Sequence, residues 1–150
     1  MTKTQTSPHF QEEHYPWRVL IVEDDESNAE VLQLLLGSEI PCQAFSFGDP
    51  DAVLQALEEI KALAPDLFII DYSLPQMTGV QLYQKLHQSD GLEQVSGMIL
   101  TAHFLIEEQK EELEQLDLEL MPKPFELEAF LAVVRRMLAG KKEALVKDMP

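Results

Sequence analysis

The sequence predicts a single α/β domain, built on a parallel sheet that carries helices on both faces. Three observations predict this class. Short apolar runs alternate with longer amphipathic segments, the runs are apolar at consecutive positions, and no internal repeat interrupts the alternation. Strands that are apolar on both sides belong in a sheet covered on both sides, whose parallel neighbours are joined by right-handed helical crossovers.

The first unit combines a buried strand and an amphipathic helix. The apolar run in residues 18–22 (RVLIV) predicts the strand. Residues 28–36 then place apolar side chains three and four positions apart, as on one face of a helix. Ser27 is expected to cap the start of this helix and Gly37 to end it.

The second unit begins with a shorter strand at residues 43–47. Asp49 and Pro50 follow in the order of an N-cap and a first helical position. The segment AVLQALEEIKALA has no helix breaker, so it is expected to continue as one helix.

Three more units follow, so that five strand and helix pairs account for residues 17–139. The strands are predicted at residues 67–70, 97–100 and 118–121, and the helices at residues 80–87, 106–116 and 127–138. Residues 1–16 are polar and contain two prolines, which predicts a flexible arm. Residues 140–150 are expected to form a tail too short to fold as an output domain.

Composition narrows the class of function. The chain has 150 residues, 45% of them hydrophobic, which suits one domain with a real core. Its formal charge of -16 repels nucleic-acid phosphates and anionic membrane surfaces, so direct DNA binding is not expected. No apolar run is long enough to span a membrane and no signal-peptide core precedes the domain, so we expect a cytoplasmic protein. Cys42 is the only cysteine and is interpreted as packing.

Polar side chains stand at or just beyond the ends of four of the five predicted strands. They are Glu23, Asp24 and Asp25 after the first strand, Asp71 after the third, Thr101 after the fourth and Lys123 after the fifth. In an open doubly wound sheet, ligands bind beyond the carboxyl ends of the strands. These side chains, far apart in the sequence, are therefore expected to converge.

This group of side chains has the composition of a phosphoryl site. A cluster of carboxylates repels itself, so either some of them are protonated or a cation sits among them, and oxygen ligands without His or Cys favour Mg²⁺. Lys123 adds a fixed positive charge and Thr101 a hydroxyl donor, both suited to phosphoryl oxygens. Asp71 is then placed as a nucleophile, because a carboxylate can accept a phosphoryl group as an acyl phosphate.

Each of these residues taken alone has a simpler explanation. Asp and Thr are common at the turns between strands and helices, where they cap helices or form surface ion pairs. Their presence together at four different strand ends makes that explanation the weaker one.

Four segments together resemble the receiver domain of two-component response regulators. VLIVEDDESNAEVL resembles the first strand, acidic pair and first helix of that family, and LFIIDYSLPQMTG resembles its phosphoacceptor segment. MILTA and MPKPF resemble the remaining two motifs. The resemblance covers residues 18–139 and implies a flavodoxin-like fold with five parallel strands in the order 2-1-3-4-5.

The resemblance implies a metal site. Glu23 and Asp24 would form the acidic pair, with Asp24 binding Mg²⁺ directly and Glu23 acting through water. Asp71 would be phosphorylated and would also contact the metal, together with the backbone carbonyl of Ser73. Asp25 lies one step beyond the pair, so a role at the start of a helix suits it better.

The resemblance also implies how the phosphoryl group is held and exchanged. Thr101 and Lys123 would bind its oxygens, and a cis bond between Lys123 and Pro124 would hold the lysine loop. The donor would be a sensor histidine kinase, a histidine phosphotransfer protein or a small phosphodonor, and hydrolysis would reset the switch. A downstream protein would bind the face formed by the fourth helix, fifth strand and fifth helix.

The chain departs from the family at several positions. Leu120 replaces the usual aromatic three residues before the lysine, which leaves the route from the site to the output face undefined. Leu116 replaces a glycine that often precedes the fifth strand. Ser73 and His103 occupy positions that tune phosphate lifetime in the family. Tyr72, next to Asp71, is interpreted as packing.

Two alternatives remain open at this point. A Mg²⁺-dependent aspartate-nucleophile phosphohydrolase of the haloacid dehalogenase class also places an aspartate after a buried strand. Its signature needs a second aspartate two residues later, where this chain has Ser73. A pseudo-receiver that uses the fold only for binding fits the leucine at position 120 but not the complete set of polar residues.

Overall fold

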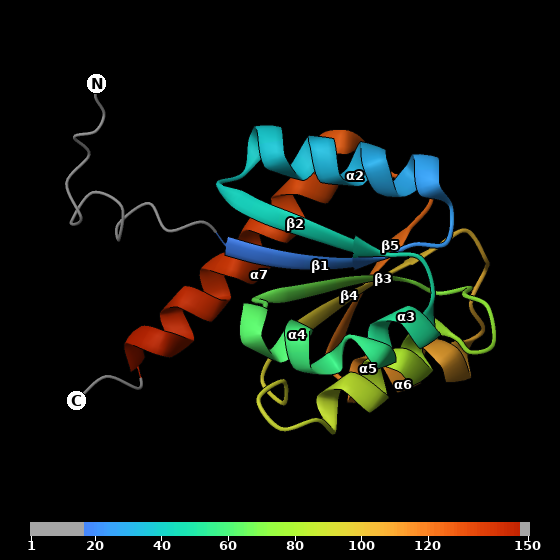
Figure 1. Cartoon of the computed structure of the whole chain (residues 1–150). Coiled ribbons are helices and arrows are strands. Elements are labelled where there is room, and N and C mark those ends of the chain that lie inside the picture. The colour runs from blue at the N-terminus through green and yellow to red at the C-terminus, as the bar shows by residue number, and fades with distance from the viewer. Residues whose placement is uncertain (1–16, 148–150) are drawn as a thin grey trace, which may run out of the picture.

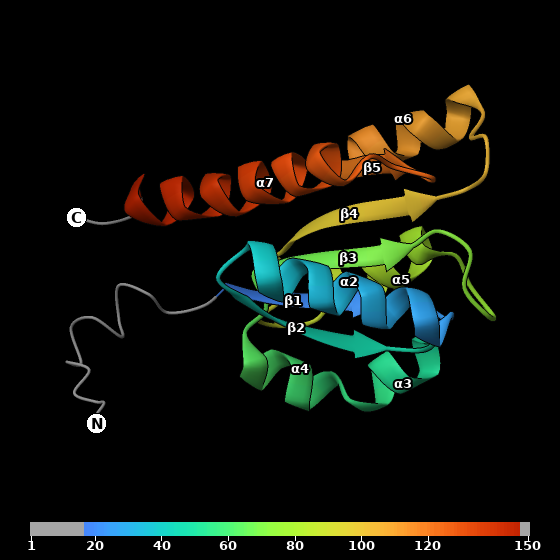
Figure 2. The same ribbon diagram turned by 90° about the horizontal axis from the view of Figure 1, so that it is seen from above.

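Five strands form one parallel sheet. The structure is a computed structural model that describes residues 17–147, with side chains described as far as residue 140. The strands are β1 (Trp17–Val22), β2 (Cys42–Phe47), β3 (Leu67–Asp71), β4 (Ser96–Thr101) and β5 (Leu118–Pro122). They lie in the order β2-β1-β3-β4-β5, and all neighbours are parallel (Figure 2). The predicted fold class and strand order are confirmed.

Helices cover both faces of the sheet, as predicted. They are α2 (Glu26–Glu39), α3 (Pro50–Gln55), α4 (Leu57–Leu63), α5 (Gly79–His87), α6 (Glu107–Gln115) and α7 (Leu127–Lys147). Helices α2 and α7 lie on one face, and α3 to α6 lie on the other (Figure 1).

Successive side chains along each strand point to opposite faces of the sheet and contribute to two apolar cores. In β1, Val19 and Ile21 pack toward α2 and α7, whereas Leu20 and Val22 pack toward α3 to α6. All four side chains are buried. The strands are therefore apolar at consecutive positions because both of their sides are covered.

The start and end of the first predicted helix were wrong. Asp25 caps α2, because its carboxylate accepts a hydrogen bond from the backbone N–H of Asn28 at 2.9 Å. Ser27 lies inside the first turn, and the helix continues through Gly37 to Glu39. A glycine weakens a helix interior by only about 1 kcal/mol, which packing on one face outweighs.

Two other helix predictions differ from the structure. The second helix is broken at Ala56, whose N–H contacts the carbonyls of both Ala52 and Val53 in a tightened turn. Asp49 and Pro50 start α3 as predicted. The last helix does not end at residue 138 but continues to Lys147, since no proline interrupts it. The predicted arm at residues 1–16 lies outside the described residues.

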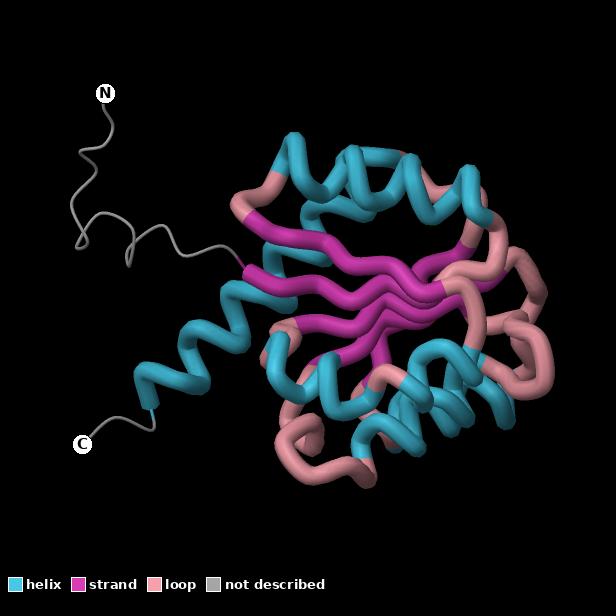
Figure 3. The backbone as a smooth tube through the Cα atoms, in the orientation of Figure 1, coloured by secondary structure: helices cyan, strands magenta, loops and turns pink. Residues whose placement is uncertain are grey.

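The carboxyl ends of the strands share one edge of the sheet. The loops that follow the strands gather there (Figure 3). At the opposite edge, Asp117 precedes β5 with a positive φ of 58°, the left-handed conformation that favours a glycine. Leu116 has a φ of -88°, so the position expected for the glycine is one residue later than predicted. In the described part of the chain, no helix is long and apolar enough to cross a membrane.

Candidate functional site

Each predicted polar residue lies at the carboxyl edge of the sheet. Glu23 and Asp24 follow β1, Asp71 ends β3, Thr101 ends β4 and Lys123 follows β5. Since β1, β3, β4 and β5 are consecutive in the sheet, these ends are neighbours in space. Local sequence explains each position, because an apolar run ends where a polar side chain begins.

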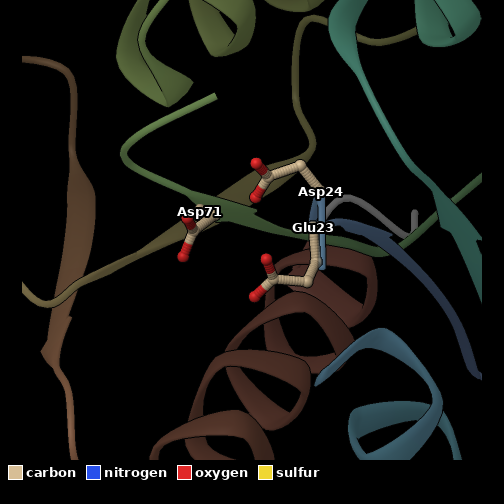
Figure 4. A group of neighbouring side chains, drawn as sticks. All are labelled: Glu23, Asp24 and Asp71. Carbon is tan, nitrogen blue, oxygen red and sulfur yellow. The ribbon is translucent and has the colours of Figure 1, made fainter. Parts of the chain in front are cut away.

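Three carboxylates form a cluster at this edge. One oxygen from each of Glu23, Asp24 and Asp71 lies within 4.8 Å of the others (Figure 4). Glu23 and Asp71 are buried, whereas Asp24 is exposed to solvent. The donors are all oxygens, and a hard divalent cation takes such a set with water completing its shell. The cluster therefore fits Mg²⁺.

Lys123 supplies the positive charge in this cluster. Its Nζ lies 2.5 Å from Asp71 Oδ1 and 3.2 Å from Glu23 Oε1. Burial alone would lower the pKa of Lys123, but its hydrogen bond to Asp71 and the charges of Asp71 and Glu23 raise it. The ammonium is therefore held in its charged form between two carboxylates.

Glu23 is the most buried acid of the group. Burial raises its pKa, and the charge of Asp71 adds to the increase. The backbone N–H of Asp25, which donates to Oε2 at 3.1 Å, and the Lys123 ammonium act in the opposite direction. Both oxygens of Glu23 are thus engaged by the protein, which leaves Asp24 as the carboxylate most open to a ligand from solvent.

Thr101 and His103 lie at the end of β4. The buried Thr101 hydroxyl accepts a hydrogen bond from the backbone N–H of His103 at 3.0 Å. His103 Nδ1 in turn lies 3.4 Å from Ser73 Oγ. The side chains two positions after Asp71 and Thr101 therefore face each other across the mouth of the site.

The loop after β5 positions the lysine. The bond between Lys123 and Pro124 is cis, as expected. The backbone N–H of Lys123 donates to the carbonyl of Thr101 at 2.7 Å. This contact ties the lysine to the end of β4, from which its side chain reaches Asp71.

Gly79 allows the chain after Asp71 to fold back on the strand. A Cβ at this position would overlap the backbone carbonyl oxygen of Asp71. The Gly79 N–H donates to the carbonyl of Tyr72 at 2.7 Å, and Thr78 caps α5 in a reciprocal pair with Gln81. Glycine is therefore required here by close backbone approach.

An apolar hollow of about 440 Å³ adjoins the carboxylates. It lies between α2 and the loop after β5, and Glu23 and Lys123 form its polar wall. The apolar wall includes Val31 and Phe125, and Val31 is 61% exposed. This surface was not predicted from the sequence. The sequence feature that could have predicted it is the apolar residue at position 31, which helical spacing places beside the buried face of the helix.

A contact between the site and α6 was also not predicted from the sequence. Tyr72 was interpreted as packing, and it does pack against the core, but its hydroxyl accepts a hydrogen bond from Gln109 Nε2 at 3.1 Å. The available signal was a glutamine three residues after the start of a predicted helix, a position where it reaches back to the helix start.

The fold and site together define a class of protein in which a buried aspartate, a lysine and an acidic pair meet at the carboxyl edge of a parallel sheet. The family model of the response regulator receiver domain matches residues 19–135. The chain belongs to this family. Members are regulatory phosphoacceptor domains, which histidine kinases or phosphotransfer proteins phosphorylate in two-component systems.

Relatives of known sequence agree with this assignment. The chain is 29% identical over 126 residues to the DNA-binding transcriptional regulator NtrC of Escherichia coli K12, a match that covers 83% of this chain and 25% of NtrC. It is 27% identical over 125 residues to the response regulator MprA of Mycobacterium avium, covering 83% of this chain and 52% of MprA. The chain thus spans only a part of these proteins.

Solved structures share the fold. The chemotaxis protein CheY4 of Vibrio cholerae superposes with a TM-score of 0.71 at 22% identity, covering 81% of this chain and 98% of CheY4. The receiver domain of an HD domain-containing protein from Pseudomonas fluorescens Pf-5 gives 0.73 at 24% identity, covering 85% and 98%.

Proposed function

We propose that Asp71 is the phosphoacceptor of this receiver domain. The observation that carries the proposal is the ammonium of Lys123 at 2.5 Å from the buried Asp71 carboxylate, beside two further carboxylates. A carboxylate oxygen of Asp71 attacks phosphorus, the P–N bond of a phosphohistidine breaks, and an acyl phosphate forms. Water later hydrolyses this acyl phosphate, which returns Asp71 to its starting state.

The other residues stabilise charge on the transferred group. Thr101 donates its hydroxyl hydrogen to one phosphoryl oxygen, and Lys123 turns from the Asp71 carboxylate to another. Glu23, Asp24, Asp71 and the backbone carbonyl of Ser73 would hold Mg²⁺, with Glu23 acting through water. When bound, Mg²⁺ neutralises phosphoryl and carboxylate charge. The protein supplies position and charge, and no turnover of an external substrate is proposed.

The donor is proposed to be a sensor histidine kinase or a histidine phosphotransfer protein, acting in the cytoplasm. The donor must bring a phosphohistidine to Asp71. The apolar hollow beside Lys123 offers a place for the apolar side chains of such a protein. Val31 and Leu34, 61% and 74% exposed on α2, extend this surface. An apolar patch beside a charged site is typical of a protein interface.

The downstream protein is proposed to bind the face formed by α6, β5 and α7. Phe104 and Ile106, at the entrance to α6, are 87% and 59% exposed. The charge of -16 makes a protein partner a better fit than nucleic acid. We further propose residues 17–139 as the receiver unit, with an N-terminal arm at 1–16 and a tail from 140 whose first residues continue α7.

The direct test is phosphate incorporation from acetyl phosphate, followed by intact mass on the full chain. We expect a labile adduct of one phosphate that requires Mg²⁺ and is lost in Asp71→Asn. The asparagine is nearly the same size, so the fold is retained. An adduct of equal yield on Asp71→Asn would refute the assignment of the acceptor.

A further inference from the structure

Tyr72 is fixed to the end of the sheet immediately after Asp71. Its backbone N–H donates to the carbonyl of Leu100 at 2.7 Å, and its own carbonyl accepts from the N–H of Gly79 at 2.7 Å. These two bonds hold its backbone to β4 and to the start of α5. The position of the Tyr72 side chain therefore depends directly on the position of the strand end that carries Asp71.

Gln109 joins this tyrosine to the first turn of α6. Its Oε1 accepts from the backbone N–H of Ile106 at 2.9 Å, and its Nε2 donates to the hydroxyl of Tyr72 at 3.1 Å. Ile106 precedes the helix and has no side-chain acceptor of its own for a helical N–H. The amide orientation is fixed, since only the oxygen can accept from Ile106.

The segment between Thr101 and α6 is therefore tied to the site at both ends. At its start, the Thr101 hydroxyl accepts from the N–H of His103 at 3.0 Å. At its end, Gln109 links Ile106 to Tyr72. Between them, Leu105 is buried, whereas Phe104 is 87% exposed. A change at Thr101 thus reaches the exposed apolar side chains of this segment and the first turn of α6.

We propose that the hydrogen bond between Tyr72 and Gln109 couples phosphorylation of Asp71 to the position of α6. This inference rests on the proposed function of Asp71. The Thr101 hydroxyl has one hydrogen, and donation to a phosphoryl oxygen withdraws it from its long 3.5 Å contact with the carbonyl of His103. The segment then shifts, the bond from Gln109 to Tyr72 breaks, and the first turn of α6 is released.

The hydrogen bond between Tyr72 and Gln109 matters because Leu120 stands where the family usually has an aromatic residue. Leu120 lies on β5 and packs in the same apolar core as Tyr72. A leucine has no hydrogen-bonding group, so it cannot follow a rotation of the Thr101 hydroxyl through a polar contact. Tyr72, in contrast, makes a polar contact from the phosphoacceptor strand to α6.

Amide hydrogen exchange of the first turn of α6 tests the coupling. The full chain is measured with Mg²⁺ alone and with Mg²⁺ and beryllofluoride, a stable mimic of the phosphoryl group. We expect exchange at residues 106–110 to rise about fivefold on addition of beryllofluoride, the size of one net hydrogen bond. In Tyr72→Phe, exchange is expected to be at the higher level already and to change little further.

Two variants and one independent measurement distinguish coupling between Asp71 and α6 from a purely structural role of the bond between Tyr72 and Gln109. Gln81 occupies the same position in α5 but contacts Thr78, so Gln81→Ala is expected to loosen α5 and leave the α6 response intact. If Tyr72→Phe raises exchange by the same factor in both states, the bond is only structural and the proposal is wrong. An unchanged wild type would also overturn it. Intact mass after acetyl phosphate treatment separately reports whether Asp71 accepts phosphate at all.

Discussion

Lys123 Nζ lies 2.5 Å from Asp71 Oδ1, although Asp71 ends β3 and Lys123 follows β5, two strands that are not neighbours. Strand β4 separates β3 from β5, so the lysine side chain reaches across the end of β4. Its backbone is anchored to that strand by the bond from its N–H to the carbonyl of Thr101. The same lysine compensates the charge of Glu23 at 3.2 Å.

Replacement of this lysine is expected to slow phosphorylation. Lys123→Met keeps the length of the side chain but removes the ammonium that binds a phosphoryl oxygen. We expect the rate with acetyl phosphate to fall about 100-fold, the usual cost of losing one preorganised donor. Lys61→Met is the matched control, because Lys61 forms an ion pair with Glu58 on α4. Equal rates in the two variants would show that Lys123 has only a structural role.

Substitution of Gly79 is expected to disturb both stability and the site. Gly79→Ala introduces a methyl group against the backbone carbonyl of Asp71. Overpacking of this kind costs roughly 1–3 kcal/mol, and we expect urea denaturation to show that loss together with slower phosphate incorporation. Gly37→Ala lies in the open on α2 and is expected to stabilise the chain by up to about 1 kcal/mol. The prediction fails if both variants are equally stable.

A charge in the apolar hollow is expected to distinguish protein donors from small ones. Val31→Asp should slow transfer from a phosphohistidine protein about tenfold, because a buried carboxylate must be desolvated on docking. Acetyl phosphate has no protein surface to dock against Val31, so its rate is expected to be unchanged. Leu127→Asp, on another exposed apolar residue at the start of α7, is the control. Equal slowing with both donors would show that Val31 affects the phosphoryl-transfer step and not the docking of the donor protein.

The stability of the fold is expected to decrease at high pH through Tyr83. Burial raises the pKa of this tyrosine to about 12, and the charge of Asp117 adds to the shift. The unfolded tyrosine titrates near pH 10, so the unfolded state loses its proton first. Between about pH 10 and 12 the free energy of unfolding therefore falls as pH rises. Urea denaturation of the wild type and Tyr83→Phe across this range measures it, and parallel slopes would contradict the assignment.

Sequence predicted the sheet well because its signals are local. The run before Asp71 is apolar at every position, which is sufficient to place a buried strand and the polar residue at its end. Convergence of Glu23, Asp71 and Lys123 then follows from the rule that parallel strands share a carboxyl edge. These parts of the site needed no knowledge of side-chain geometry.

The parts that sequence missed depend on competition between neighbours or on long-range contacts. The role expected for Asp25 at a helix start is confirmed, but Ser27 is also a good cap by type, and only the path of the chain after β1 selects the aspartate. The break at Ala56 lies in a stretch without any breaker. The bond between Tyr72 and Gln109 joins residues whose approach depends on how α6 packs on the sheet.

Locating the phosphoryl group on the chain tests most directly whether Asp71 is the phosphoacceptor. The protein is phosphorylated with Mg²⁺ and a phosphohistidine donor, the acyl phosphate is reduced with borohydride, and the peptides are sequenced by mass spectrometry. We expect reduction to convert Asp71, and no other acidic residue, to homoserine. Conversion at Glu23 or Asp24, with Asp71 intact, would contradict the assignment of Asp71 as the phosphoacceptor.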